Sequence, residues 1–407
     1  MKYKNKKVKF CLLCKNRKLK KLLSLGNLFV SNFVTKKNIK VGPRAPLNLL
    51  YCKKCSLIQL SHIARTEIMY RRFYWYRSGV TKIMKLALKN IFEDSLKNVR
   101  LNKDDVVLDI GANDGTLLNY YKKKNFKTIG CDPAKNFKSL LQKNSDFIIN
   151  NFWKKEELDK IILKNKLKKP KIITAIGMFY DLEDPNRFIR DAADSLHEDG
   201  IFIAQLMCLK NMIEKNDLGN ICHEHIEFYS LKSLKFLFEG NGLEIFKIEE
   251  NEINGGSYRL YCKKYNKGSI KLKNENVLNL MKGFKKRVKS NKKITMNFIK
   301  KKVKEGKKIY LYGASTKGNT VLQYYGINNK QIPYAAERSP EKWGKYTIST
   351  GIKIIKEKDA RNFKPDYFFV TPWGFIKEFI KRENLWLKGG GSFIVPFPKL
   401  RIIKSHD

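Results

Sequence analysis

Short apolar runs and helix-like stretches alternate through the middle of the chain. Runs of strand length, each bounded by turn residues, occur at 106–110, 128–131, 172–176 and 201–206. Helix-like stretches separate them, and a further helical stretch at 79–103 precedes them. Strands that alternate with helices predict a parallel sheet. Two later runs predict an antiparallel pair that closes this block, at 243–249 and 258–262.

The C-terminal part also passes from a strand into a glycine-containing turn. Residues 266–307 are rich in lysine with spaced apolar positions, which predicts a long amphipathic helix between domains. The run 308–312 then enters Gly-Ala-Ser-Thr-Lys-Gly, and strand-like runs follow at 367–370 and 392–395. We therefore expect an α/β protein with three parts: a small turn-rich domain, an α/β domain and a second α/β domain, over residues 1–75, 76–265 and 266–407.

Composition narrows the class of protein. The 407 residues are 43% hydrophobic, which is enough for packed cores. No apolar run approaches the ~18 residues of a membrane span, and no apolar segment of a signal peptide follows the basic N-terminus. We expect a soluble cytoplasmic protein with no membrane partner. The sequence does not fix the oligomeric state, and a monomer is compatible with it.

The charge balance is strongly basic, with 84 Lys and Arg, 38 Asp and Glu and a formal net charge of +46. Such a charge favours an anionic partner, such as nucleic acid, an anionic membrane or a phosphorylated substrate. Only 15 of the basic residues are Arg, the side chain on which specific phosphate and base recognition usually depends. We interpret most of the charge as solvated lysine and do not expect nucleic acid as the partner.

Four of the eight cysteines form two Cys-x-x-Cys pairs within the first 75 residues. Tetrahedral zinc takes four ligands, and each pair supplies two thiolates from one turn. In a reducing compartment such pairs favour a metal over disulfides. Four thiolates leave no open coordination position, so the sequence predicts a structural Zn²⁺ site whose ligands are Cys11, Cys14, Cys52 and Cys55.

The first run of the middle block enters the turn Asp-Ile-Gly-Ala-Asn-Asp-Gly over 109–115. This loop matches the first motif of class I S-adenosylmethionine (SAM) methyltransferases. Gly111 lets the backbone turn close to a ligand, and Asp109 can orient the amino group of its methionine part. The alternative, an NAD-type loop, would read Gly-x-Gly-x-x-Gly. The spacing favours SAM, with Asn113 and Gly115 in the same loop.

Two further segments complete the predicted cofactor site. Asp132 ends the second strand, 23 residues after Asp109, where a carboxylate can accept hydrogen bonds from both ribose hydroxyls. Asn151 and Phe152 follow the third strand position and can contact adenine.

An acid/base cluster lies in Cys222-His223-Glu224-His225, in a chain that has only five histidines. Imidazole titrates near neutrality, and a nearby carboxylate raises its basicity and fixes its tautomer. This favours proton removal from a carbon next to a carbonyl. The alternatives are a metal pair, His223 with His225, or a buried polar turn.

Together these motifs resemble the sugar C-methyltransferases that act on nucleotide-linked 4-keto-deoxy sugars. The resemblance covers nearly the whole chain in order, from the two Cys pairs through the SAM loop and Glu224-His225. It continues through Gly-Gly-Ser-Tyr-Arg at 255–259, Tyr-Gly-Ala-Ser-Thr-Lys-Gly-Asn-Thr at 312–320 and Pro-Trp-Gly at 372–374. It implies a zinc-binding N-terminal domain, a class I SAM methyltransferase domain and a C-terminal Rossmann-like domain that helps to hold the sugar nucleotide.

The resemblance also implies roles for individual residues. His225 would remove the proton beside the ketone, with Glu224 and His223 in support, and Tyr76 would contact the keto sugar. The resulting enolate carbon would attack the SAM methyl group. The diphosphate or base would lie against the 313–320 loop with Ser315, Lys317 and Asn319, and against Arg259, while Cys222 would be a small residue of the substrate pocket.

Three positions depart from the family pattern. Members often carry a Tyr where this chain has Cys222, a family His is replaced within Phe179-Tyr180-Asp181, and His223 is an unusual neighbour for Glu224. These changes leave open which sugar and which carbon are methylated. The alternatives are O- or N-methylation of a sugar nucleotide, or an RNA methyltransferase in which the zinc domain and the charge grip the backbone.

Overall fold

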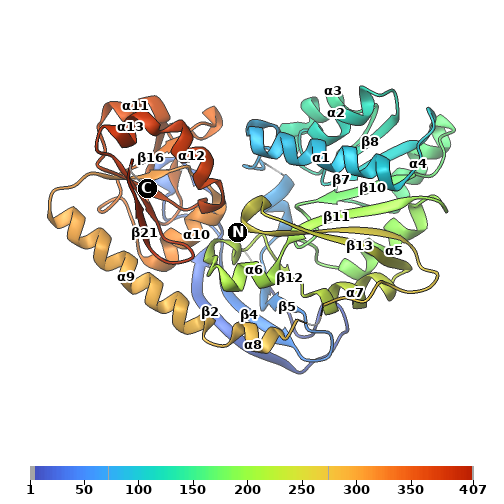
Figure 1. Cartoon of the computed structure of the whole chain (residues 1–407), viewed down its shortest axis with the longest axis horizontal. Coiled ribbons are helices and arrows are strands. Elements are labelled where there is room, and N and C mark those ends of the chain that lie inside the picture. The colour runs from blue at the N-terminus through green and yellow to red at the C-terminus, as the bar shows by residue number, and fades with distance from the viewer. Residues whose placement is uncertain (1–4, 72, 274, 406–407) are drawn as a thin grey trace.

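Two large twisted sheets dominate the computed structural model, which describes residues 5–71, 73–273 and 275–405. Figure 1 shows the central sheet on the right, the C-terminal sheet on the left and the long strands of the N-terminal block below and between them. Within the described ranges, no helix is both long enough and apolar enough to cross a membrane.

The central sheet has seven strands in the order β13-β14-β11-β10-β7-β8-β9. The five strands from β11 to β9 run parallel, and β14 and then β13 are each antiparallel to the preceding strand. The strands are β7 (Val106–Ile110), β8 (Lys127–Cys131), β9 (Phe147–Ile149), β10 (Ile172–Ile176), β11 (Ile201–Met207), β13 (Leu243–Asn251) and β14 (Ser257–Lys264). All residues of β7 and β11 are buried, as expected where helices cover both faces of a parallel sheet.

Seven helices belong to this block: α1 (Lys82–Asn98), α2 (Thr116–Lys122), α3 (Lys138–Asn144), α4 (Lys155–Asn165), α5 (Pro185–Ser195), α6 (Leu209–Glu214) and α7 (Leu231–Glu239). Side chains at their N-termini explain where several begin. Thr81 accepts a hydrogen bond from the Met84 amide at the start of α1, and Asp184 does the same for Arg187 at the start of α5.

The C-terminal sheet has eight strands in the order β21-β20-β19-β15-β16-β18-β17-β3. Five of them are parallel: β15 (Ile309–Tyr312), β16 (Tyr334–Glu337), β18 (Lys353–Lys356), β19 (Tyr367–Val370) and β20 (Ser392–Val395). The others are β17 (Tyr346–Thr347), β21 (Arg401–Ile403) and β3 (Phe33–Val34). Packed around it are α10 (Thr316–Tyr325), α11 (Glu357–Asn362), α12 (Ile376–Arg382) and α13 (Asn384–Lys388).

The N-terminal block forms part of both neighbouring blocks. Its strands are β1 (Lys6–Lys7), β2 (Leu19–Phe29), β3, β4 (Arg44–Cys52), β5 (Ile58–Leu60) and β6 (His62–Ile63). The edge of the four-stranded sheet β12-β5-β4-β2 is β12 (Glu227–Phe228), which belongs to the middle of the chain, and β3 joins the C-terminal sheet. The three-domain division stays a prediction, and the sheets do not follow its boundaries strictly.

The predicted long helix at 266–307 is shorter and broken in the structure. It consists of α8 (Val277–Met281) and α9 (Phe284–Lys304), which Gly283 separates at a φ of +75°. The buried residues of α9 lie four, three, four and four positions apart, so they share one face: Phe284, Val288, Asn291, Thr295 and Ile299. Most lysines of α9 are exposed, and the helix runs along the edge of the molecule (Figure 1).

Candidate functional site

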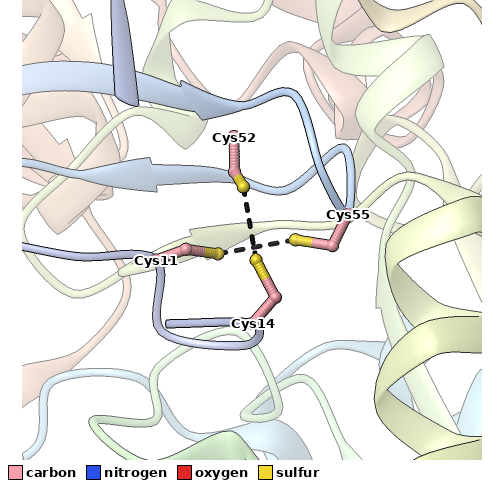
Figure 2. Close-up of side chains that lie close together, drawn as sticks. All are labelled: Cys11, Cys14, Cys52 and Cys55. Atoms are coloured by element: carbon pink, nitrogen blue, oxygen red, sulfur yellow. Dashed lines mark hydrogen bonds between the residues drawn. The ribbon is translucent and has the colours of Figure 1, made fainter. Parts of the chain in front are cut away.

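The four paired cysteines converge on one point (Figure 2). The Sγ atoms of Cys11 and Cys55 lie 3.4 Å apart, as do those of Cys14 and Cys52, and all four lie within 4.8 Å of one another. Zn–S bonds of about 2.3 Å place tetrahedral sulfurs about 3.8 Å apart, so the cluster fits Zn²⁺. This confirms the predicted zinc-binding donor set, and its four thiolates match a structural metal.

A cavity of about 560 Å³ lies between the carboxyl ends of the strands of the two large sheets. From the central sheet come the residues that follow β7, β8, β9, β10 and β11, and from the C-terminal sheet those that follow β15 and β19. Ligands of open α/β sheets bind at such carboxyl ends. Ten of the predicted site residues line this cavity: Tyr76, Asp109, Gly111, Asn113, Asp132, Phe152, Glu224, His225, Ser315 and Lys317.

Asp109 lies buried where β7 ends, and its Oδ1 accepts a 2.6 Å hydrogen bond from Thr174 Oγ1 on the neighbouring β10. Burial raises the pKa of this carboxyl to about 7, the Thr174 hydrogen bond opposes the rise and the Asp132 charge adds to it. A cationic amino group bound here would favour the ionised carboxylate. The surroundings of Asp109 thus suit the ammonium group of SAM.

The loop after β7 is shaped around Gly111 and Asp132. Gly111 has a φ of +77°, and a Cβ there would lie 2.5 Å from Met178 Cγ. The Asp132 carboxylate accepts one hydrogen bond from the Asn113 amide and one from the Ala134 amide, each 2.8 Å. Each oxygen keeps a second acceptor position for a ribose hydroxyl. These residues fit the cofactor that the loop sequence predicts.

The segment that carries Tyr76 is tied to the same loop. The Asn113 side chain accepts from the Ser78 amide at 2.9 Å and donates to the Tyr76 carbonyl at 2.9 Å, and Asp114 Oδ2 accepts from the Gly79 amide at 3.0 Å. These bonds hold the segment beside the cofactor loop. Tyr76 is 42% exposed at the edge of the cavity, where a ligand could cover its ring.

His225 is buried in the turn before β12, and its contacts define its protonation. Nδ1 lies 2.8 Å from the Asn220 carbonyl oxygen, which can only accept, so Nδ1 carries the proton and Nε2 keeps a lone pair. Burial lowers the pKa of the imidazole well below its usual range, and the Lys317 charge lowers it further. The Tyr180 ring packs against it at 4.4 Å between centroids. His225 is therefore neutral and able to accept a proton.

Asn220 connects this imidazole to the C-terminal block. Its Oδ1 accepts a 2.7 Å hydrogen bond from Lys317 Nζ on α10, and its Nδ2 donates to Asp217 Oδ2 at 2.8 Å. Glu224 lines the cavity nearby, with Oε2 buried and unpartnered, and burial raises its pKa. The turn thus holds a neutral base, a carboxyl group and a cation from the neighbouring block.

Two predicted members of the acid/base cluster lie elsewhere. His223 Nε2 lies 2.9 Å from the Ala45 carbonyl on β4, and burial lowers the pKa of the ring to about 4. The structure thus places His223 away from the cavity wall and not with His225 as predicted: its ring connects the turn to the N-terminal sheet. Cys222 is fully buried and is not part of the described cavity wall, so it supports the turn from behind.

Four more predicted contacts do not reach the cavity wall. Arg259 is buried in a network of its own, because its guanidinium donates to Gln205 at 3.0 Å, to Asn90 at 2.8 Å and to Asp94 at 3.0 Å. The structure therefore places Arg259 in this network and not on the cavity wall, where the predicted diphosphate contact would be. Gly115 precedes α2. The side-chain oxygen of Asn151 accepts a hydrogen bond from the Phe152 amide, and Asn319 is buried in α10.

The structure adds residues to which the sequence assigns no role in the site. Asp181 lines it with a buried, unpartnered Oδ1, and Thr174 and Asn220 position Asp109 and His225. Asp181 follows the carboxyl end of β10, which lies beside β7. An acidic residue at such a strand end is a sequence feature that can indicate a site residue. Nothing local marks Asn220, whose role depends on two partners from elsewhere in the fold.

Three family profiles match successive parts of the chain. Residues 11–70 match one described as "Putative zinc binding domain", residues 80–248 a "Methyltransferase domain" and residues 252–398 a "C-methyltransferase C-terminal domain". Among curated proteins, the chain is similar to the C-methyltransferase NovU of Streptomyces niveus, with 24% identity over 377 residues that cover 89% of this chain and 88% of that protein.

Two of the solved structures that resemble the chain each cover just under half of it. Magnesium protoporphyrin IX methyltransferase (ChlM) from Synechocystis PCC 6803 is 11% identical with a TM-score of 0.36, covering 47% of this chain and 91% of that one. The cyclopropane synthase MmaA2 from Mycobacterium tuberculosis is 12% identical with a TM-score of 0.36, covering 48% and 90%.

Proposed function

We propose that the chain is a SAM-dependent C-methyltransferase whose acceptor is a nucleotide-linked keto-deoxy sugar methylated through an enolate. The matches to a zinc-binding domain, a methyltransferase domain and a C-methyltransferase C-terminal domain, in that order along the chain, support this proposal. The observation that carries this proposal is the fixed neutral tautomer of His225. An enolate route needs a base beside the acceptor carbon, and Nε2 of His225 supplies one at the cavity wall.

SAM, when bound, supplies an electrophilic methyl group at its sulfonium. Asp109 would hold its ammonium group, Asp132 its ribose hydroxyls and Phe152 would lie near its adenine, since all three line the cofactor side of the cavity. His225 would take a proton from the carbon beside the ketone, with the electron pair moving to the ketone oxygen. The enolate carbon would then accept the methyl group that bound SAM supplies. The C–C bond would form as the sulfonium S–CH3 bond breaks, leaving S-adenosylhomocysteine and restoring the ketone.

The C-terminal sheet contributes the opposite wall of the cavity. Ser315 caps α10 by accepting a hydrogen bond from the Gly318 amide at 2.9 Å, and Ser315, Thr316 and Lys317 line the cavity. The start of α10, with the positive end of the helix dipole, therefore lies at the cavity wall. Phosphate groups bind well at such a helix start beside a lysine. This arrangement supports a diphosphate bound at the start of α10 beside Lys317. Arg259 does not line the cavity and is not part of this proposed contact.

The test is hydrogen exchange in deuterated buffer with a panel of nucleotide-linked keto-deoxy sugars. We expect the wild-type protein to exchange the hydrogen beside the ketone, and to methylate the same carbon when SAM is added. His225→Asn should lose both by about 10²–10⁴-fold. The matched control is His223→Asn, two positions away, which removes a buried ring and should leave exchange intact in the folded fraction.

Product fragmentation by mass spectrometry locates the new methyl group. A methyl on oxygen or nitrogen would overturn the enolate route, and so would a His225→Asn variant that exchanges the hydrogen as fast as the wild type.

A further inference from the structure

Asp181 lies in a turn that is bonded directly to the turn of His225. Its amide donates to the Met178 carbonyl at 3.0 Å, and the carbonyl of its neighbour Tyr180 accepts from the Ile226 and Glu227 amides at 2.8 and 3.0 Å. Ile226 follows His225 in the chain. The backbone therefore holds the Asp181 turn against the His225 turn, and both side chains line the same cavity.

Asp181 and Glu224 line the cavity as two carboxyl groups, of which Glu224 is buried and Asp181 is partly buried. Asp181 Oδ1 and Glu224 Oε2 are buried without a hydrogen-bond partner, and Glu224 is only 7% exposed. One cation faces them, Lys317, and its ammonium group already donates to Asn220. A further buried carboxyl, Glu227, also faces Asp181, and burial raises its pKa well above the usual range. The other titratable groups around Asp181 have pKa values raised by burial and stay neutral in the physiological range: Tyr70, Tyr74, Tyr180, Cys222 and Tyr229.

Two ionised carboxyl groups at this cavity wall beside a single cation are unfavourable, so the pair retains a proton. Burial raises the pKa of Asp181 well above its usual range, and the Glu224 charge raises it further. Glu224 has hydrogen bonds from Cys222 and Thr316 that favour its ionised form. The Lys317 charge and a hydrogen bond from Tyr70, whose hydroxyl also lies 2.8 Å from the Glu224 carbonyl, oppose the rise in the Asp181 pKa without reversing it. The proton therefore resides on Asp181.

We infer that Asp181 is a further catalytic acid of this site, whose neutral carboxyl donates a hydrogen bond to the ketone oxygen while His225 removes the neighbouring proton. This role rests on the proposed function. The C–H bond breaks, its proton goes to His225 Nε2, and the negative charge that develops on the oxygen is stabilised by the Asp181 O–H. When the new C–C bond forms and the ketone returns, Asp181 still holds its proton.

Two substitutions separate this role from a structural one. Asp181→Asn keeps a donor without an ionisable group, whereas Asp181→Ala removes the donor. Glu183→Gln is the matched control, because Glu183 belongs to the same loop and lines the cavity but is partly exposed in an ion pair with Lys6. Thermal melting and SAM titration show first that each variant folds and binds its cofactor.

With an accepted keto sugar, we expect Asp181→Ala to lose about 10²–10³-fold in kcat and Asp181→Asn about tenfold or less. The wild-type rate should fall as alkaline pH ionises Asp181, and the rate of Asp181→Asn should lack that decline. An Asp181→Ala variant that matches Glu183→Gln, or an identical pH profile in Asp181→Asn, overturns the inference.

A second measurement needs no substrate. Infrared difference spectra between the wild type and Asp181→Asn at neutral pH should contain the C=O band of a protonated carboxyl, and a carboxylate band there overturns the inference. If the band is present but the wild type neither exchanges nor methylates any keto sugar, the proposed function fails, and the hydrogen bond to a ketone is overturned with it.

Discussion

The pH dependence of SAM binding tests the assignment of Asp109. This carboxyl is buried at the end of β7, and burial raises its pKa to about 7 in the free protein. An ammonium group binds the ionised form and not the neutral one, so SAM and a proton compete for Asp109. SAM affinity should therefore fall as the pH falls through the pKa of the free carboxyl, and binding should release a proton.

The structure sets the size of the effect. With a pKa of about 7, Asp109 is about half ionised at pH 7 and about one-tenth ionised at pH 6. The affinity should drop about fivefold between pH 7 and pH 6, and about tenfold, or about 1.4 kcal/mol, for each further pH unit below 6. At pH 6 each SAM should displace about one proton, and at pH 7 about half. The amino group of SAM itself loses its proton near pH 8, so the window lies below about pH 7.5.

Isothermal titration in two buffers of different ionisation enthalpy measures both the affinity and the protons released. Asp109→Asn should bind weakly with little pH dependence, and it retains any contribution of Asp132, whose pKa burial also raises. Thr174→Val removes the hydrogen bond that favours ionised Asp109 and should move the midpoint to higher pH. A wild-type affinity that is constant between pH 6 and 7.5, or binding without proton release, would refute the assignment.

Three further predictions follow from the same contacts. The protein should contain one Zn²⁺ by metal analysis, and chelation or Cys55→Ser should lower the Tm, because four thiolates then lose their metal. Gly111→Ala should weaken SAM binding in titration by about tenfold or more, since a Cβ there would meet Met178 at a φ of +77°. Arg259→Met should destabilise the fold by about 2 kcal/mol in urea unfolding, with KM for the acceptor unchanged in the folded enzyme. The change removes the donor to Gln205 and Asn90 and leaves Asp94 paired with the exposed Lys97 instead of the buried guanidinium.

The local sequence predicts the bounds of several strands in the two large sheets. The runs at 106–110, 172–176, 367–370 and 392–395 are strands with the same bounds in the structure. Each is a continuous apolar segment between turn residues, and a strand buried on both faces requires just that pattern. The strands β3 and β12 were not foreseen, because two residues carry no periodicity and their partners are distant in the chain.

The site likewise contains residues that local sequence motifs predict and residues whose position depends on contacts with distant parts of the chain. Backbone motifs predict Asp109, Gly111 and Asp132 because a strand end and a positive φ fix those positions locally. His223 and His225 look equivalent in the sequence. They differ only because the carbonyl of Ala45, 178 residues away, takes one ring and the carbonyl of Asn220 takes the other. Side-chain direction in this turn depends on the sheet that packs behind it, and no spacing reveals it.

Both large sheets have a strand that leads into a glycine-containing turn, but the acidic residue at the end of the next strand has different contacts in the two sheets. In the central sheet Asp132, at the end of the second strand, accepts two backbone amides and keeps acceptor positions for a ribose. In the C-terminal sheet Glu337 occupies the equivalent place, and its carboxylate accepts amides of Ala314, Arg338 and Ser339 and lies 3.5 Å from Lys342 Nζ. Those contacts use the positions that a ribose would need. The C-terminal sheet therefore lines the shared cavity with its β15–α10 turn and does not repeat the ribose-binding position of the central sheet.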